Sequence, residues 1–424
     1  MKSRVVALLA APVVAACGRT PPALPDPVAE RCALLTAAGP PPDTLIVGVA
    51  GTVARDHAPV PTTRAERLVF AHFYETLLTV NCQDRPLPAL AERWSVTEGG
   101  RRVSFTLRDG ARFWDGAPVT AQDVLASWAD HEWLVSSAAA PDPRTVSAWL
   151  ARLDPDVARL FADPRLSVTR PGKEASGPVG TGALRPVEWT STRIVATPPG
   201  RERPVIVFRT EVGADPRDLL ESGTDLVMTD DPATLEYARG HPGLDVVPLP
   251  WGRTYVLAGA GFGALTGGDS LAALVVSAAV RAEVRAAEPP FWWTSVDVCA
   301  DSPLLGTTVP SGPAMRRIAY AAGDPIAQDL AGRIVALAAA GRALGGGQVR
   351  AVGMRPEAFD SALFVGSEFA FVTAISKQSH PACVPAALKR SVPLLDARSS
   401  VVLRRGRVGV AVGWDAVPRL LFQP

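Results

Sequence analysis

The chain has 424 residues, with 43 lysines and arginines against 42 aspartates and glutamates, so its formal net charge is +1. This length is enough for more than one lobe with a large hydrophobic core. The balanced charge provides no overall field that would favour nucleic acid or a strongly acidic partner. After the N-terminal segment the sequence contains no run of about 18 apolar residues, so no membrane-spanning helix is predicted there.

Residues 1–17 have the pattern of a bacterial lipoprotein signal peptide. Basic residues precede an apolar stretch from Val5 to Ala16, and the segment ends in Val-Ala-Ala-Cys, the form of a lipobox. In such leaders the cysteine, here Cys17, is lipidated, and each acyl methylene buried in a membrane contributes about 0.8 kcal/mol. The alternative is ordinary cleavage with Cys17 as a bystander. We predict a lipid anchor, followed by an extended tether over 18–42, which is rich in proline and alanine.

A strand, a loop and a helix are predicted after the tether. Thr44–Val49 is a short apolar run rich in β-branched residues, and a helical pattern covers about 64–78. The loop between them therefore leaves the carboxyl end of a strand. Open α/β sheets bind their ligands at that end of their strands.

The segment from Arg102 to Trp128 predicts a hairpin followed by a capped helix. Apolar and polar residues alternate over 102–107, as in a half-buried strand. Two Asp-Gly pairs predict tight turns around a short return strand at 111–114. Thr120 and Asp123 have the spacing of a capping box, which predicts that a helix begins there.

The rest of the chain alternates strands and helices, a pattern that predicts mixed sheets covered by helices. Helices are expected near 147–153, 156–161, 216–222, 232–239, 271–287 and 325–340. Strands are expected near 184–189, 193–196, 205–209, 225–228, 244–248, 255–258, 316–321, 349–354, 362–365 and 369–374, with paired strands over 392–421.

The sequence carries no recognisable catalytic motif. It contains no G-x-S-x-G, H-E-x-x-H, G-x-G-x-x-G or G-x-x-x-x-G-K. The five histidines stand singly, and no cysteine or histidine has zinc-ligand spacing. Asp230 and Asp231 precede a proline and a predicted helix, where N-capping explains them. We therefore predict a protein that is not an enzyme and that holds no cofactor or metal.

Four stretches are similar to those of a known family. Between Arg102 and Trp128, the short segments LRDG, FWDG, PVTAQDV and SW align with its signature. Val69–Trp94 agrees with its opening helix and P-x-L-A-E-x-W segment, Val179–Trp189 with its V-G-T-G strand, and Ser222–Met228 with its S-G-x-x-D segment. The chain resembles the family-5 extracellular solute-binding proteins, the peptide, dipeptide and nickel receptors of bacterial ABC importers. The resemblance is good over about residues 43–260 and weaker beyond.

This resemblance implies an α/β fold with two lobes, the large type II periplasmic-binding-protein fold with mixed sheets and a hinge cleft. Lobe I would span 43–252, including a hairpin subdomain at about 75–175. Lobe II would span 253–391, and the C-terminal strands, 392–424, would return to lobe I. Closure of the lobes on a ligand would present a joint surface to a permease.

Four cysteines remain after Cys17, an even number that suggests two disulfides in an exported chain and allows three pairings. On the implied fold we favour Cys32–Cys82 and Cys299–Cys383, because each pair would then stay within one lobe.

The resemblance also places candidate ligand contacts in the cleft, where solute sites need aromatic walls and a few placed polar groups. They come from the loop after the first strand, from the crossing between lobes and from lobe II: Thr62, Thr63, Arg64, Trp251, Arg253, Tyr255 and Glu368. Packing in the lobe interface is an equal alternative for Trp251. Glu368 stands near the place of an aspartate that pairs with the ligand's ammonium in peptide receptors; the plainer alternative is a capped or surface glutamate. Core packing is the simpler interpretation of Trp114, Trp292 and Trp293.

The function implied is that of a lipid-anchored, extracytoplasmic solute-binding protein, which delivers a peptide-like or other small solute to an ABC permease in the inner membrane. We expect a periplasmic monomer that touches the membrane only through its lipid and binds no nucleic acid. Two alternatives stay open. One is a sensing or scaffold lipoprotein that kept the fold without transport, and the other is a nickel-chelate or haem receptor of the same family.

Overall fold

The computed structural model describes residues 32–35, 42–83, 85–131, 135–150, 157–172, 177–211, 213–258, 293, 316–340, 349–365, 369–377, 388 and 391–421. Several predictions from the sequence lie outside this part of the chain: the lipobox with Cys17, the helix at 271–287, Trp292, Glu368 and the pairing of Cys299 with Cys383.

A seven-stranded mixed sheet forms the centre of lobe I, in the order β13-β19-β12-β2-β11-β10-β9. Strand β2 lies in the middle, parallel to its neighbours β11 and β12, and its apolar run fits a strand buried between two covered faces. The strands are β2 (Thr44–Ala50), β9 (Arg185–Trp189), β10 (Arg193–Thr197), β11 (Val205–Glu211), β12 (Leu226–Thr229), β13 (Leu244–Pro248) and β19 (Ser400–Arg404).

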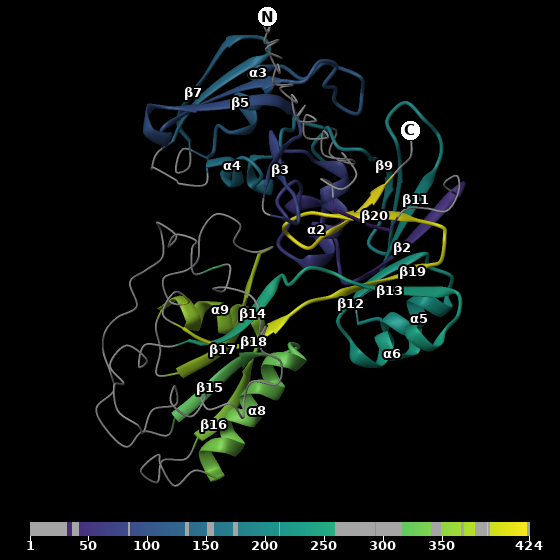
Figure 1. Cartoon of the computed structure of the whole chain (residues 1–424), viewed down its shortest axis with the longest axis vertical. Helices are drawn as coiled ribbons and strands as arrows, with labels where there is room; N and C mark the ends of the chain where they lie inside the picture. The colour runs from purple at the N-terminus through teal and green to yellow at the C-terminus, as the bar shows by residue number, and fades with distance from the viewer. Residues whose placement is uncertain are drawn as a thin grey trace, which may run out of the picture.

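Helices cover both faces of this sheet (Figure 1). Helix α2 (Arg64–Phe73) packs its apolar residues on one face, beside Leu45, Val47 and Phe208. Helices α5 (Pro216–Glu221) and α6 (Pro232–Gly240) pack on the other face, against Val227 and Val402.

A three-stranded sheet, in the order β1-β20-β21, joins the first described strand of the chain to two of its last strands. Its strands are β1 (Ala33–Leu35), β20 (Gly409–Val412) and β21 (Pro418–Leu421). The predicted tether is therefore wrong for 33–35, because this short apolar run pairs with β20 instead of remaining extended alone.

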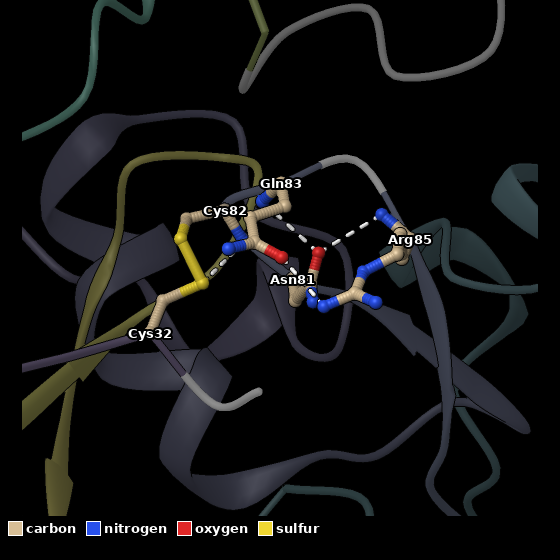
Figure 2. The surroundings of a disulfide bond; sticks show 5 residues. All are labelled: Cys32, Asn81, Cys82, Gln83 and Arg85. Atoms are coloured by element: carbon tan, nitrogen blue, oxygen red, sulfur yellow. Dashed lines mark hydrogen bonds between the residues drawn. A yellow bond between two sulfur atoms is a disulfide. The ribbon is translucent and has the colours of Figure 1, made fainter. Parts of the chain in front are cut away.

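Cys32 and Cys82 form a disulfide, with their Cα atoms 5.9 Å apart. Figure 2 shows the turn that carries Cys82: the Asn81 side-chain oxygen accepts from the amides of Gln83 at 3.0 Å and Arg85 at 2.9 Å. The disulfide therefore joins β1 to a turn that is fixed by its own hydrogen bonds.

The hairpin subdomain is a four-stranded sheet in the order β5-β6-β8-β7, with a second core around Phe105, Phe161 and Trp128. Its elements, with a small hairpin below it, are β3 (Leu78–Val80), β4 (Pro86–Pro88), β5 (Ala91–Thr97), β6 (Arg102–Leu107), α3 (Ala121–Ser127), β7 (Val135–Asp142), β8 (Thr145–Leu150) and α4 (Val157–Leu160). Strand β6 alternates buried and half-buried residues as predicted, and Thr120 and Asp123 form the predicted capping box.

Two predictions for this subdomain are wrong. The helix expected at 147–153 is wrong for 147–150, which form the second half of β8 and pair with both β6 and β7. The return strand expected at 111–114 is only a single bridge between Arg112 and Pro118. Pairing with neighbouring strands overrides local helix preference at 147–150.

A five-stranded sheet in the order β16-β15-β17-β14-β18 forms lobe II. Its elements are β14 (Arg253–Ala258), β15 (Arg316–Ala321), α8 (Pro325–Ala340), β16 (Val349–Met354), α9 (Pro356–Val365), β17 (Phe369–Ser376) and β18 (Val392–Ala397). Helix α8 packs on one face and α9 on the other. The strand predicted at 362–365 is therefore wrong, because a short apolar run fits a buried helix equally well.

The chain passes between the lobes twice. It leaves β13 and enters β14 through residues 249–252, and it leaves β18 and returns to β19 through 398–399. Because β18 pairs with β14, residues 392–397 belong to the lobe II sheet, and the return to lobe I comes after them. The fold is the predicted two-lobed mixed α/β architecture. No helix in the described ranges is long and apolar enough to cross a membrane.

Candidate functional site

Three elements bring Arg64 and Arg253 together on one carboxylate, Asp230. Arg64 opens α2, Arg253 begins β14, and Asp230 follows β12. Arg64 Nη1 donates to Asp230 Oδ2 at 3.2 Å, and Arg253 Nη2 donates to the same oxygen. Arg64 Nη2 also donates to the hydroxyl of Ser399 on the returning crossover. Two of the predicted residues, Arg64 and Arg253, therefore meet at the junction of the two lobes, where both bind Asp230.

The carboxylate that links them was interpreted from the sequence as an N-cap. Asp231 does cap α6, accepting from the Thr234 amide at 2.7 Å. Asp230 instead pairs with the two arginines. Burial raises the pKa of Asp230, but the adjacent Arg64 and Arg253 outweigh it and hold that pKa below its usual value.

Tyr255 and Trp251 also lie in internal contacts. The buried Tyr255 hydroxyl donates to Asp324 at 3.0 Å, and burial raises the pKa of this phenol. The ring of Trp251 lies 4.6 Å from the guanidinium carbon of Arg398, at the lobe junction. The space between Arg64, Arg253 and their neighbours is about 10 Å³, which holds no more than a water molecule.

Thr62 and Thr63 shape the loop between β2 and α2. Thr63 caps α2, and its partner in the capping box is Glu66, whose side chain is 1% exposed. The Glu66 carboxylate also accepts from the Thr62 amide at 2.7 Å and hydroxyl at 2.8 Å, and from the Ala54 amide at 3.1 Å. His57 Nδ1 lies 2.7 Å from the same carboxylate.

Glu66 and His57 influence each other's protonation. Burial raises the pKa of Glu66, but the hydrogen bonds from Thr62 and His57 outweigh it, so the pKa lies below its usual value. The hydrogen bond to Glu66 raises the pKa of His57. A buried, ionised carboxylate therefore fixes the loop that follows the first strand.

A cavity of about 400 Å³ lies beside α2. Its wall is formed by α2, the β2–α2 loop, the hairpin subdomain, the turn between β20 and β21, and one residue of lobe II. The apolar part of the wall includes Pro59, Pro61, Phe70, Ala71, Tyr74 and Trp414. The charged part consists of Arg67, Arg108, Arg159, Lys377, Arg419, Glu75 and Asp415.

Both carboxylates in this wall are held by an arginine. Arg108 binds Glu75 through two contacts of 3.1 and 3.0 Å, and Arg419 binds Asp415 through two contacts of 3.1 and 3.0 Å. Burial raises the pKa of Asp415, but Arg419 outweighs it and keeps that pKa low. These bidentate pairs fix the orientation of both acids.

The other cations are arranged differently. Arg67 lies half-buried on α2, and its side chain makes no hydrogen bond or ion pair within the described residues. Arg159 of α4 and Lys377 at the end of β17 each lie 4.9 Å from the ring of the buried Trp414. The amide of Lys377 donates to the carbonyl of Gly252 at 2.9 Å, so this lobe II residue is held to the first crossover.

The residues of this cavity were not predicted from the sequence. On α2 the signal was available, because Arg67, Ala71 and Tyr74 recur at helical spacing and share one face. Trp414 and Lys377 carry no local signal, since only the fold brings them together. Trp114 and Trp293 are buried, as the core interpretation expected. Among the residues that the structure describes, no group of three His, Cys, Asp or Glu side chains could hold a metal.

Comparison with known proteins identifies the segment that carries the signature. Residues 85–198 match the family described as bacterial extracellular solute-binding proteins, family 5 middle. The predicted resemblance to family 5 is confirmed. The match covers the hairpin subdomain and the strands that lead back into the lobe I sheet.

Curated relatives match over short segments. A probable deoxycholate-binding periplasmic protein of Escherichia coli (strain K12) is 30% identical over 126 residues, 28% of this chain and 22% of that protein. The periplasmic murein peptide-binding protein of the same organism is 39% identical over 87 residues, 20% of this chain and 14% of that protein. The matched segments thus span about a fifth or less of these relatives.

Similarity to solved structures extends over most of the chain. NikA from Brucella suis in complex with Fe(III)-EDTA superposes with a TM-score of 0.64 and 15% identity, covering 90% of this chain and 100% of that one. At this identity the likeness establishes the two-lobed fold alone.

Proposed function

We propose that this protein is a lipid-anchored, extracytoplasmic solute-binding protein of an ABC importer, which binds a peptide-like or other small solute between its lobes. The observation that carries the proposal is the cavity of about 400 Å³, whose wall contains residues of lobe I and Lys377 of lobe II. Its volume lies in the range of small-molecule sites. Relatives named as peptide- and deoxycholate-binding periplasmic proteins support the class of function.

The hinge supports the same function. Both crossovers lie beside the ionic cluster of Arg64, Asp230 and Arg253, so rotation of the lobes would take place around a fixed ionic contact. A solute that contacts both lobes would favour the closed arrangement, and a permease in the inner membrane would recognise that arrangement. The residues 1–17 would supply the lipid anchor, and the protein would act as a periplasmic monomer without enzymatic activity.

The test is native mass spectrometry of the Cys17→Ser protein purified from its own host. We expect a small molecule to co-purify and to be lost on mild unfolding. A mass without ligand, together with no thermal shift from peptides, metal chelates, organic acids or sugars, would overturn the proposal and favour a sensing or scaffold lipoprotein.

A cavity-filling variant locates the site. Ala71 lies half-buried on α2 in the cavity wall, so Ala71→Trp should occupy the space and abolish retention of the molecule. Ala233→Trp, at an exposed position of α6, is the matched control and should retain it. Equal retention by both variants would remove the cavity from the site.

A further inference from the structure

The charges of the cavity indicate what kind of solute it takes. Among the described residues, the wall carries five cationic side chains and two carboxylates, an excess of three positive charges, although the whole chain has a net charge of only +1. The excess is therefore local, and in a cavity with apolar walls it acts on a bound solute more strongly than it would in water.

Neither carboxylate is placed to bind a cation from a solute. Glu75 accepts two hydrogen bonds from Arg108, and Asp415 accepts two from Arg419 and a third from the Val417 amide. Arg419 also keeps the pKa of Asp415 low. Asp163, an acid that attracts Arg67 from a distance, is 3% exposed and is bound by Arg165. The ammonium group of a peptide would thus have to break an existing ion pair in order to find a counter-charge in this part of the wall.

Arg67 has the opposite character. Burial lowers the pKa of its guanidinium, and Asp415 and Asp163 attract it from a distance without binding it. A half-buried guanidinium that no described residue binds can form two charge-assisted hydrogen bonds when a carboxylate or phosphate arrives. Arg159 and Lys377 add two further positive charges beside Trp414, and Phe70 and Tyr74 supply an apolar floor.

We propose that the cavity selects a small organic acid that carries more than one acidic group on an apolar or aromatic body, with Arg67 as its principal anchor and Lys377 as the contact from lobe II. This inference rests on the proposed receptor function and defines its substrate class. Inorganic phosphate alone would leave the apolar floor uncovered, whereas an aromatic or alicyclic acid would cover it.

The experiment measures binding to the Cys17→Ser protein by isothermal titration calorimetry. The probes are isophthalate, its neutral diamide, trialanine and inorganic phosphate. We expect isophthalate to bind at least about tenfold more tightly than the diamide, since charge-assisted hydrogen bonds to a desolvated arginine are stronger than neutral ones. Equal or tighter binding of the diamide or of trialanine would overturn the inference, and so would phosphate binding as tightly as isophthalate.

Variants identify the anchor. Arg67→Met keeps the length and apolar stem of the side chain, and it should weaken isophthalate binding about tenfold or more while leaving diamide binding unchanged. Arg239→Met removes one positive charge from an exposed position of α6 and is the matched control, with no expected effect. Unchanged isophthalate affinity in Arg67→Met would refute the role of Arg67.

The outcomes separate the two proposals. If the protein retains a ligand from its host but that ligand is neutral or cationic, the receptor function stands and the anionic selectivity is refuted. If nothing co-purifies and none of the four probes binds, the receptor function itself fails. The comparison of acid with amide uses the unsubstituted cavity, so it decides the question even if Arg67→Met does not fold.

Discussion

The contact of Arg64 and Arg253 with Asp230 gives the sharpest prediction for the hinge. Asp230→Asn keeps the shape of the side chain and removes its charge, which leaves two arginines facing each other across the lobe junction. The exposed fractions are 38% for the Arg64 side chain, 32% for Asp230 and 14% for Arg253. The cluster is therefore neither a surface pair nor a fully buried one.

These exposed fractions determine how much free energy of unfolding we expect Asp230→Asn to remove. Exposed ion pairs contribute up to about 1 kcal/mol, whereas removal of one partner from a buried pair costs about 3–5 kcal/mol. For a cluster between these limits we expect Asp230→Asn to lower the free energy of unfolding by about 2 kcal/mol. Urea unfolding followed by tryptophan fluorescence measures this loss, and Asp231→Asn, at the cap of α6, is the neighbouring control.

A double-mutant cycle with Arg253→Met tests the cause. Because both changes break the same contact, the double variant should be less destabilised than the sum of the single variants, with a coupling of about 1–2 kcal/mol. Additive effects would show that Asp230 and Arg253 do not stabilise each other. A loss below about 0.5 kcal/mol in Asp230→Asn would refute the argument from partial burial.

The pH dependence has a defined sign. The pKa of Asp230 in the folded protein lies below its ordinary value of 3.8, so its contribution is present above that value and is lost as the pH falls through the folded pKa. Asp230→Asn should remove this part of the acid sensitivity. An unchanged acid unfolding profile would contradict the assignment.

Three further predictions concern other contacts. Cys17→Ser should move the protein to the soluble fraction in cell fractionation, and persistent membrane attachment would defeat the lipobox hypothesis. Replacing Cys32 and Cys82 together by serine should cost about 2–4 kcal/mol in urea unfolding, as expected for a disulfide that closes a long loop; no change would mean that the bond does not form. Since Glu66 raises the pKa of His57, the stabilisation from charging His57 is present below its ordinary pKa of 6.5 and is lost as the pH rises through the folded value. An NMR titration should therefore show a His57 pKa above 6.5 that falls toward 6.5 in Glu66→Gln, and equal values in both proteins would refute the contact.

Local signals in the sequence predicted much of the fold. The strand at 244–248 and the helix at 325–340 have the bounds that the pattern indicated, because turns or prolines mark their ends. The capping box of Thr120 and Asp123 is specified by two residues alone. One error arose where a partner lies far away in the sequence: residues 147–150 become a strand because they pair with the distant β6 as well as with the adjacent β7.

The candidate site also contains residues that the sequence order indicates and residues that only distant contacts bring into place. The order of strands and crossovers predicted that Arg64 and Arg253 lie at the cleft, and in the structure both bind Asp230 at the lobe junction. The sequence did not identify Asp230, which pairs with residues 166 and 23 positions away and has the local surroundings of a helix cap. The cavity wall joins α2, α4, the end of β17 and the turn after β20, and no local pattern relates those four segments.

The hinge and the cavity are connected through Lys377. Its amide is bonded to Gly252 on the first crossover, next to Arg253 in the ionic cluster, while its ammonium lies against Trp414 in the cavity wall.

A solute shifts a conformational equilibrium only by the difference in its affinity for the two states. Arg67 belongs to lobe I and would bind an acid in either arrangement of the lobes, so it contributes affinity. Lys377 moves with lobe II, so its contact with the same acid would exist only when the lobes are close. It follows that Lys377→Met should reduce ligand-induced compaction in small-angle scattering more than it reduces affinity, whereas Arg67→Met should do the reverse.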